Sequence, residues 1–376
     1  MNDFAKNALL PNGLRDILPL DAEFEADVVS RVSAHFSAQG YDRVKPPLIE
    51  FEDTLLDGVG AAMAKQCFRV MDPVTQKMMG VRPDMTPQVA RIARTRLAGS
   101  PRPLRLSYAG QVLRVKGSQL RPERQFGQAG IELIGIDCPE ADAEVAILAA
   151  EALVALGVPG VSIDLSLPTL VPALLSGLNL AEETLRGSLD HKDAAAVLAL
   201  GGAAAALLSA LLQAAGPAER ALSLLAGLEL PEAAAAERDR LAEVVGLIAA
   251  AIPEVTLTID PVENRGFEYH TGISFTLFGQ NISGELGRGG RYLAGGTEPA
   301  TGATLFLDTV LAALPGPVAV QRAFIPVGTP RALAQALRAQ GWVTVAGLQA
   351  VADNAAEAKR LGCGHVLMAD GVKSVE

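Results

Sequence analysis

One stretch of consecutive strand patterns constrains this fold most. Residues 104–135 predict two or three strands, and helical patterns lie on either side of them. Runs of strands next to runs of helices, without a regular βαβ alternation, are typical of an antiparallel sheet of α+β type. We therefore expect an antiparallel sheet flanked by helices.

Capping and proline signals predict the helices around this sheet. Asp21 is expected to cap a helix that ends near Gly40, and Thr86 followed by Pro87 is expected to open a helix that runs to about Gly99. A third helix is predicted from Pro139. The first helix has apolar residues at helical spacing: Phe24, Val28, Val32 and Phe36.

A change in composition divides the chain. Residues 168–253 are rich in Ala and Leu and predict a helical insertion. Residues 1–167 and 254–315 would form a discontinuous core, in which strand signals resume at 255–260, a hairpin turns near 279–280 and residues 304–314 form a helix. Residues 318–376 alternate strand and helix patterns and predict a small α/β unit.

Bulk composition limits the class of protein. The chain has 376 residues, 49% hydrophobic and 20% charged, as expected of a globular protein. Its net charge of −10 argues against broad binding to nucleic acid or an anionic membrane. The uncharged residues 194–218 could span a bilayer, but they are mostly Ala and predict packed helices instead. Without a visible secretory signal we expect a cytoplasmic protein.

Cysteine and histidine give no sign of a metal or a cofactor. The three cysteines lie far apart and have no metal-ligand spacing. A lone His270 is more often structural than ligating, and the glycine-rich residues 284–292 are a weak phosphate signal without P-loop spacing. We expect no metal, no cofactor and no catalytic residues.

Basic residues concentrate between Arg82 and Arg124. This stretch carries ten Lys and Arg residues but only two acidic ones. The interpretation for Arg91, Arg94 and Arg96 is a solvated helix face. The remaining candidates flank strand ends and predict a loop that faces an anion: Arg114, Lys116, Arg121 and Arg124.

The strand RQFGQAGIEL (124–133) has an unusual polar face. Gln128 and Glu132 project to the same side, because side chains alternate along a strand, and Gly130 lies between them. We expect the glycine to leave an open floor between the amide and the carboxylate, which indicates a ligand pocket.

Several ordered segments resemble the catalytic core of histidyl-tRNA synthetase, a class II aminoacyl-tRNA synthetase. The similarity extends over roughly residues 9–314, and the segment with Pro46 and Pro47 resembles the dimer-forming motif of that class. The matching segments are PNGLRDILP (11–19), GYDRVKPPLIE (40–50), VRPDMT (81–86), YAGQVLR (108–114), QFGQAGIELIG (125–135), NRGFEYHTG (264–272) and GGRY (289–292).

The resemblance implies a pocket for L-histidine. Gln128 and Glu132 would receive its α-ammonium and imidazole groups, and Arg114 would hold its carboxylate. Gly130 would leave room for the ring. Five further residues would complete the pocket, of which Tyr269 and His270 lie in a histidine-specific loop: Asp84, Thr86, Arg265, Tyr269 and His270.

Three departures argue against an active synthetase. Thr309 stands where the family has an arginine that grips ATP phosphates, and Lys116 stands where it has a glutamate near the adenine. The C-terminal unit is also short for an anticodon-binding domain. Smaller changes are Asp84 for Glu and His270 for Tyr.

This profile resembles the synthetase-like regulatory subunits of short-form ATP phosphoribosyltransferase, the first enzyme of histidine biosynthesis. The resemblance implies a non-catalytic subunit that supports a short catalytic partner and mediates feedback by L-histidine, as a homodimer within a hetero-oligomer. An active histidyl-tRNA synthetase is the alternative. A weaker third possibility is a free-standing synthetase-like protein that modifies another substrate or senses uncharged tRNA.

Overall fold

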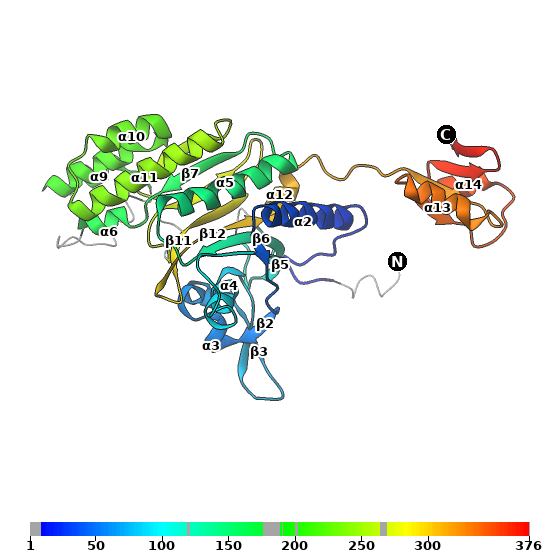
Figure 1. Cartoon of the computed structure of the whole chain (residues 1–376), viewed down its shortest axis with the longest axis horizontal. Helices are drawn as coiled ribbons and strands as arrows, with labels where there is room; N and C mark the ends of the chain where they lie inside the picture. The colour runs from blue at the N-terminus through cyan, green and yellow to red at the C-terminus, as the bar shows by residue number, and fades with distance from the viewer. Residues whose placement is uncertain are drawn as a thin grey trace. The chain divides into compact units, whose positions relative to one another are not determined.

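The structure is a computed structural model that describes residues 9–118, 121–175, 189, 191–199, 202–263 and 269–375. It divides into two compact units, Met1–Gly316 and Pro317–Glu376. The first unit is built on a nine-stranded sheet with the order β1-β5-β6-β12-β11-β10-β7-β9-β8 (Figure 1). Neighbouring strands are antiparallel except for β1 with β5 and β7 with β9. The expected α+β class with a sheet flanked by helices is therefore confirmed.

The predicted strands of residues 104–135 are two long neighbours, β5 and β6. A third long strand, β12, was not predicted, because its small residues resemble a loop. The strands of the sheet are β1 (Asp42–Arg43), β5 (Leu104–Leu113), β6 (Gln125–Ile134), β7 (Ser162–Ser166), β8 (Gly216–Pro217), β9 (Thr256–Asp260), β10 (Ser274–Phe278), β11 (Gly287–Ala294) and β12 (Glu298–Phe306).

Two boundaries predicted near β12 are wrong. The helix expected at 304–314 is α12 (Leu307–Ala313), which begins only after β12 has ended. The second arm of the predicted hairpin also begins later than expected, because residues 279–286 form the turn and β11 follows. The glycine-rich residues 284–292 are thus mostly strand.

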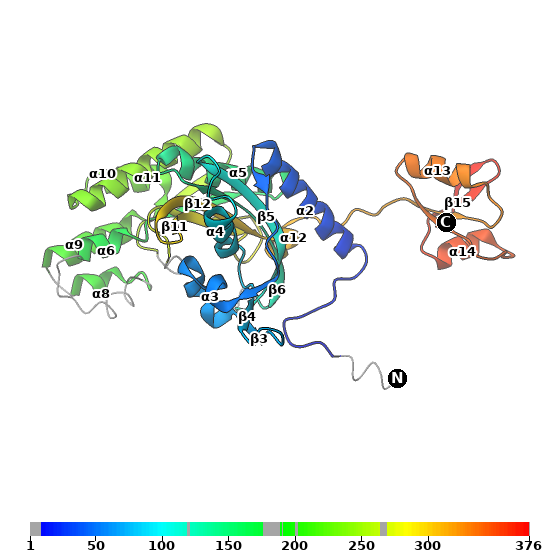
Figure 2. The same cartoon turned by 60° about the horizontal axis from the view of Figure 1, so that its bottom comes forward.

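Helices α2 (Asp21–Ala38) and α5 (Pro139–Leu156) pack on one face of the sheet, and α11 (Glu232–Ala251) packs against α5 (Figures 1 and 2). Val28 and Phe36 of α2 share this core with Ile131 and Leu133 of β6. The predicted cap of α2 is wrong: Asp21 is its first residue, and the residue before it makes no side-chain cap hydrogen bond.

The opposite face of the sheet packs against α4 (Thr86–Thr95). Val89 of α4 contacts a core that includes Tyr108, Phe126 and Phe306. A smaller sheet, with the order β2-β4-β3, lies in the segment that leads to α4. The elements of this segment are β2 (Ile49–Phe51), α3 (Glu52–Leu55), the 3-10 helix Gly58–Gln66, β3 (Phe68–Met71) and β4 (Met78–Val81).

The Ala-rich segment is mostly helical where it is described, and it also contains the short strand β8. Its buried Leu208, Leu211 and Leu241 belong to the same apolar core as α2 and α5. No helix of the described residues is long and apolar enough to cross a membrane. The helices that precede α11 in this segment are α6 (Leu170–Leu175), α8 (Ala194–Ala199), α9 (Gly202–Ala214) and α10 (Ala218–Ala226).

The second unit is a four-stranded sheet with the order β14-β13-β15-β16. Ile325 and Leu337 belong to one small core, and Phe324 and Ala358 belong to another. Strand β16 was not predicted. The elements are β13 (Arg322–Ile325), α13 (Arg331–Ala339), β14 (Val343–Ala346), α14 (Asn354–Arg360), β15 (His365–Met368) and β16 (Gly371–Ser374).

Candidate ligand pocket of the synthetase-like core

A cavity of ≈ 140 Å³ lies between the first turn of α4 and strands β11 and β12. Of the eight predicted site residues, Gln128 does not line this cavity and Arg265 lies outside the described residues. The other six come together in its wall: Asp84, Thr86, Arg114, Glu132, Tyr269 and His270.

Glu132 is the buried acid of the cavity, with 1% of its surface exposed. Its carboxylate accepts hydrogen bonds from Tyr292 at 2.8 Å, Thr86 at 2.9 Å and Tyr108 at 3.2 Å. The pKa of this carboxyl is raised from 4.5 to about 8, because burial, together with the nearby Asp84, raises it more than the hydroxyl donors lower it. A cationic or proton-bearing ligand group would fit this position.

The Thr86 side chain contacts a pocket residue and does not cap helix α4. It was predicted to cap α4, but Met85 holds the cap position without a side-chain hydrogen bond. The carboxylate of Asp84 accepts instead from the backbone N–H of Thr86 at 2.9 Å. The Thr86 hydroxyl is thereby left to donate to Glu132.

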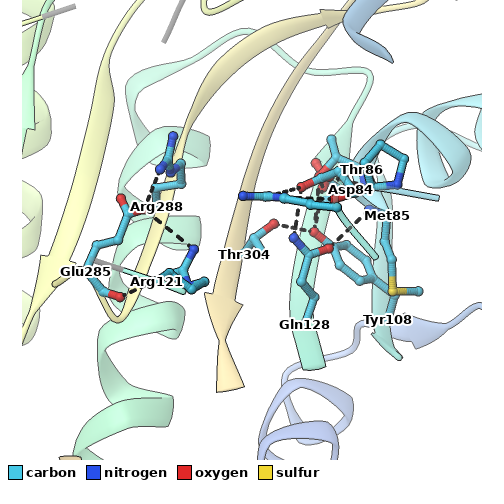
Figure 3. Close-up of polar contacts among 12 residues, drawn as sticks. Asp84, Met85, Thr86, Tyr108, Arg121, Gln128, Glu285, Arg288 and Thr304 are labelled. Carbon is cyan, nitrogen blue, oxygen red and sulfur yellow. Dashed lines mark hydrogen bonds and ion pairs between the residues drawn. The ribbon is translucent and has the colours of Figure 1, made fainter. Parts of the chain in front are cut away.

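Gln128 lies outside the cavity and holds one residue of its wall, Asp84, in position. It is fully buried, its side-chain nitrogen donates to Asp84 at 2.9 Å, and its oxygen accepts from the backbone N–H of Met85 at 3.2 Å (Figure 3). The amide therefore fixes the direction of the Asp84 carboxylate. The sequence correctly placed Gln128 and Glu132 on one face, but only Glu132 reaches the cavity.

The predicted open floor at Gly130 is wrong. A Cβ atom there would lie 2.5 Å from the Tyr108 ring and 2.4 Å from the Ala303 carbonyl oxygen. The Tyr108 phenol then meets the Thr304 hydroxyl of β12 at 2.7 Å (Figure 3). The space next to Gly130 is therefore filled by the Tyr108 ring and is not open to a ligand.

Arg114 supplies a positive charge to the cavity wall. Its guanidinium lies 3.8 Å from the Asp84 carboxylate and 5.0 Å from the centre of the Phe126 ring, and it donates to the Pro83 carbonyl oxygen at 3.2 Å. Burial lowers the pKa of Arg114, although Asp84 opposes this change. Two cations, Arg114 and Arg288, and two carboxylates around a small cavity suit a zwitterion that carries a further polar group.

The other basic residues of the predicted anion-facing loop do not reach the cavity. Arg124 donates to the Asn12 carbonyl oxygen, and Lys116 is exposed. The interpretation of Arg91 as a solvated residue is also wrong, because it forms a half-buried ion pair with Glu50. Arg94 and Arg96 are exposed, as predicted.

Arg121 fills a place beside the pocket. It pairs with Asp308 at 2.9 Å, stacks 3.9 Å from the Phe306 ring centre and donates to the Thr309 hydroxyl at 3.4 Å. Glu285 lies 3.9 Å from Arg121 and also contacts Arg288 (Figure 3). The cation next to Thr309 is therefore Arg121, which already forms an ion pair within the protein.

Three polar lining residues were not among the predicted site residues: Arg288, Tyr292 and Thr304. Arg288 and Tyr292 lie on β11, within or next to the GGRY segment, so the resemblance could have indicated them. Thr304 lies on the unpredicted strand β12, opposite Gly130 of β6. Among the residues that the structure describes, no group of three His, Cys, Asp or Glu could hold a metal ion.

Known proteins are similar to this chain over most of its length. Residues 13–310 match the family model described as histidyl-tRNA synthetase. A Paramagnetospirillum magneticum protein named ATP phosphoribosyltransferase regulatory subunit is 68% identical over the whole of both chains. A protein of the same name from Rhodospirillum centenum is 60% identical over 98% of this chain and 97% of its own.

Solved structures share the fold. A Bacillus halodurans structure described as an ATP phosphoribosyltransferase regulatory subunit/histidyl-tRNA synthetase is 25% identical with a TM-score of 0.81, over 94% of this chain and 96% of that one. Histidyl-tRNA synthetase from a Nostoc species has a TM-score of 0.80 at 18% identity, over 96% and 91% of the two chains. The latter similarity shows the fold alone.

Proposed function

The chain belongs to the synthetase-like family of ATP phosphoribosyltransferase regulatory subunits, and on that premise we propose that its pocket binds free L-histidine as a feedback signal. As a regulatory subunit the chain is not itself the catalyst. Its partner would be a short catalytic subunit that transfers the phosphoribosyl group to ATP at the start of histidine biosynthesis. The observation that carries this proposal is the cavity whose wall contains Arg114 together with Asp84 and Glu132.

The chemistry of histidine matches this wall group by group. Its α-ammonium would meet Asp84, which Gln128 holds in place, and its α-carboxylate would meet Arg114. Its imidazole would meet Glu132, with Tyr269 and His270 stacked at a centroid distance of 4.2 Å on the cavity wall. A charge-assisted hydrogen bond is about twice as strong as a neutral one, so each pairing would add to specificity. Arg265 remains a proposed member of the same site.

The neighbouring site supports a subunit without adenylation activity. A class II synthetase would need a cation at position 309 that is free to bind ATP phosphates. Here Thr309 is neutral, and Arg121 beside it is already paired with Asp308. The alternative of an active synthetase therefore lacks the free cation that a nucleotide clamp requires at this position.

We also propose a homodimer within the hetero-oligomer. One face of the β2-β4-β3 sheet carries only apolar side chains, and none of them is buried. An exposed apolar face next to edge strands suits a protein interface. The members of this face, named here the small-sheet face, are Ile49, Phe51, Phe68, Val70, Met79 and Val81.

A cytoplasmic location fits the proposed role. The three cysteines are all free, and Cys67 and Cys363 are buried. Free thiols suit a reducing compartment. The proposed partner uses ATP and would share that compartment.

Calorimetry with the Glu132→Ala variant tests histidine binding. Loss of one partner of a charge-assisted bond should cost about 1.5–3 kcal/mol, or about ten- to a hundredfold in affinity. The matched control is Glu254→Ala, which removes an exposed carboxylate from the loop between α11 and β9. The measurement uses the chain alone and in complex with a short catalytic subunit. Absence of histidine binding by the wild-type chain in both forms would refute the proposal.

A further inference from the structure

Glu132 is a pocket carboxyl without a cationic partner among the described residues. All of its hydrogen-bond partners are hydroxyl groups, from Thr86, Tyr108 and Tyr292. Its surroundings are also tight, since a Cβ atom at Gly302 would lie 1.8 Å from its Oε2 atom. Only 1% of its surface is exposed, so a charge there is poorly solvated by water.

The charged groups that face Glu132 do not neutralise the negative charge of its carboxylate. Ahead of α4, Asp84 brings a second negative charge, and Arg114 at the end of β5 lies against Asp84 at 3.8 Å. On β11, Arg288 is engaged by Glu285. The titratable side chains from β5, from β11 and from the segment that precedes β10 are Tyr108, Tyr292, Tyr269 and His270.

This arrangement favours the neutral form of the acid. A carboxylate removed from water is costly unless a cation or enough donors meet it. Burial raises the pKa of Glu132 to about 8, so the carboxyl of the empty pocket is mostly protonated at neutral pH. The pKa values of Tyr108 and Tyr292 are raised by burial as well, so both phenols stay neutral donors.

We propose that Glu132 carries a proton in the empty pocket at neutral pH and shares that proton with a ring nitrogen of bound histidine. This inference rests on the proposed histidine site. In the complex the proton lies between a Glu132 carboxyl oxygen and the ring nitrogen, whichever atom holds it more tightly. Neutral histidine therefore binds near pH 7 without any exchange of protons with the solvent.

The proposal gives histidine affinity two pH limits. Below about pH 6.5 the free imidazole is cationic, so formation of the complex must release one proton. Above about pH 8 the empty pocket has lost its proton, so formation must take one up. Affinity is therefore highest between these values and falls by up to about tenfold per pH unit on either side.

Proton exchange can be measured directly. Calorimetric titrations of the full chain with L-histidine, in buffers of different ionisation enthalpy, give the number of protons exchanged. With a ring pKa of about 6.5 and a pocket pKa of about 8, the ring and Glu132 together should release about 0.8 proton at pH 5.8, exchange none near pH 7.2, and take up about 0.75 proton at pH 8.5, where the ligand amine adds its own uptake. An ordinary carboxylate that forms an ion pair with the ring would take up most of a proton already at pH 7.2.

Glu132→Gln is the matched variant. It keeps the shape and a hydrogen-bonding group but cannot titrate, so the uptake at pH 8.5 should fall to the amount that the ligand amine contributes. Glu254→Gln removes an exposed carboxylate outside the pocket and should leave the alkaline uptake in place. If Glu132→Gln does not bind, infrared difference spectra of wild type with and without histidine give a second measurement. They should contain a protonated-carboxyl band of the empty pocket near pH 7 that the variant lacks.

The outcomes separate the two proposals. If wild type binds no histidine at any pH, the proposed function fails and this inference with it. If histidine binds but the alkaline uptake is absent, equal in Glu132→Gln, or already complete at pH 7.2, only the inference is overturned. Absence of the protonated-carboxyl band near pH 7 also overturns it.

Discussion

The side-chain amide of Gln128 donates a 2.9 Å hydrogen bond to Asp84, and thereby connects a fully buried strand residue to the cavity wall. Replacement by Leu would leave the backbone N–H of Met85 without its acceptor and free the Asp84 carboxylate. We expect Gln128→Leu to lower the free energy of unfolding by about 1–3 kcal/mol and to weaken histidine binding, although Gln128 lies outside the cavity. Urea denaturation and calorimetry measure the two effects.

The matched control for Gln128 is Gln111 on β5. It donates a similar 2.8 Å hydrogen bond, to Glu25, but does not contact the pocket wall. Gln111→Leu should reduce stability and leave histidine affinity unchanged. Equal histidine affinity in wild type and Gln128→Leu would show that Asp84 needs no support from the amide.

Gly130 should be required for the fold, not for ligand access. A methyl group at this position would overlap the Tyr108 ring and the Ala303 carbonyl oxygen. We expect Gly130→Ala to lower the free energy of unfolding by more than about 2 kcal/mol, as typical of overpacked cores. Gly246 in α11 is the control, because a methyl group there meets no atom within 4 Å and should stabilise the helix by up to about 1 kcal/mol. A stable Gly130→Ala protein that excludes histidine would support the open-floor hypothesis instead.

The sequence predicted the polar face of β6 because strand alternation is a local property. The same alternation says nothing about the neighbouring strand, and the pairing of Tyr108 with Gly130 is what fills the expected hole. Thr86 shows the same limit, since Thr before Pro is typical of a helix cap and only the position of Glu132 explains its actual partner. Ordered motifs therefore predicted the fold and six of the residues in the cavity wall. Cross-strand neighbours decided which other side chains line it.

Small residues explain the missed strand. β12 has the sequence EPATGATLF, which has few of the bulky β-branched or aromatic residues that favour strands. In the sheet these small side chains lie between β6 and β11, and Gly302 faces Glu132. The buried Glu132 carboxyl on the neighbouring strand β6 is what requires small residues here. The sequence of β12 alone does not reveal this neighbour.

Adenylation should be absent and should not return with a single arginine. The Thr309 hydroxyl lies 3.4 Å from the Arg121 guanidinium, so Thr309→Arg would place two cations together. We expect no histidine-dependent ATP–pyrophosphate exchange from wild type or from this variant, and a lower stability for Thr309→Arg than for the control Thr309→Val. Exchange at a rate typical of a synthetase in wild type would contradict this expectation.

The small-sheet face should hold two copies of the chain together. Phe51 has 41% of its surface exposed and lies on this face. A carboxylate there would have to leave water to enter an apolar dimer interface, so Phe51→Asp should shift the chain toward monomers in sedimentation experiments without the catalytic subunit. Val74 is 87% exposed and precedes β4, so Val74→Asp is the control and should stay dimeric. A wild-type monomer at micromolar concentration would contradict the interface.

Stability of the histidine-free protein should fall with rising pH because of Glu132. Its pKa is 4.5 in an unfolded chain and about 8 in the folded one, so the unfolded state loses its proton first. The contribution of Glu132 to stability is therefore complete below pH 4.5 and is lost progressively as the pH rises to about 8, by up to about 1.4 kcal/mol per pH unit. Burial also raises the pKa of Asp164, Glu237 and Asp308, which adds slopes of the same sign. The Glu132→Gln variant retains those slopes and loses only its own, so the stability difference between variant and wild type should grow in favour of the variant between pH 5 and 8. Urea denaturation at a fixed protein concentration measures this difference, and parallel curves for the two proteins would mean that Glu132 is already ionised in the empty pocket.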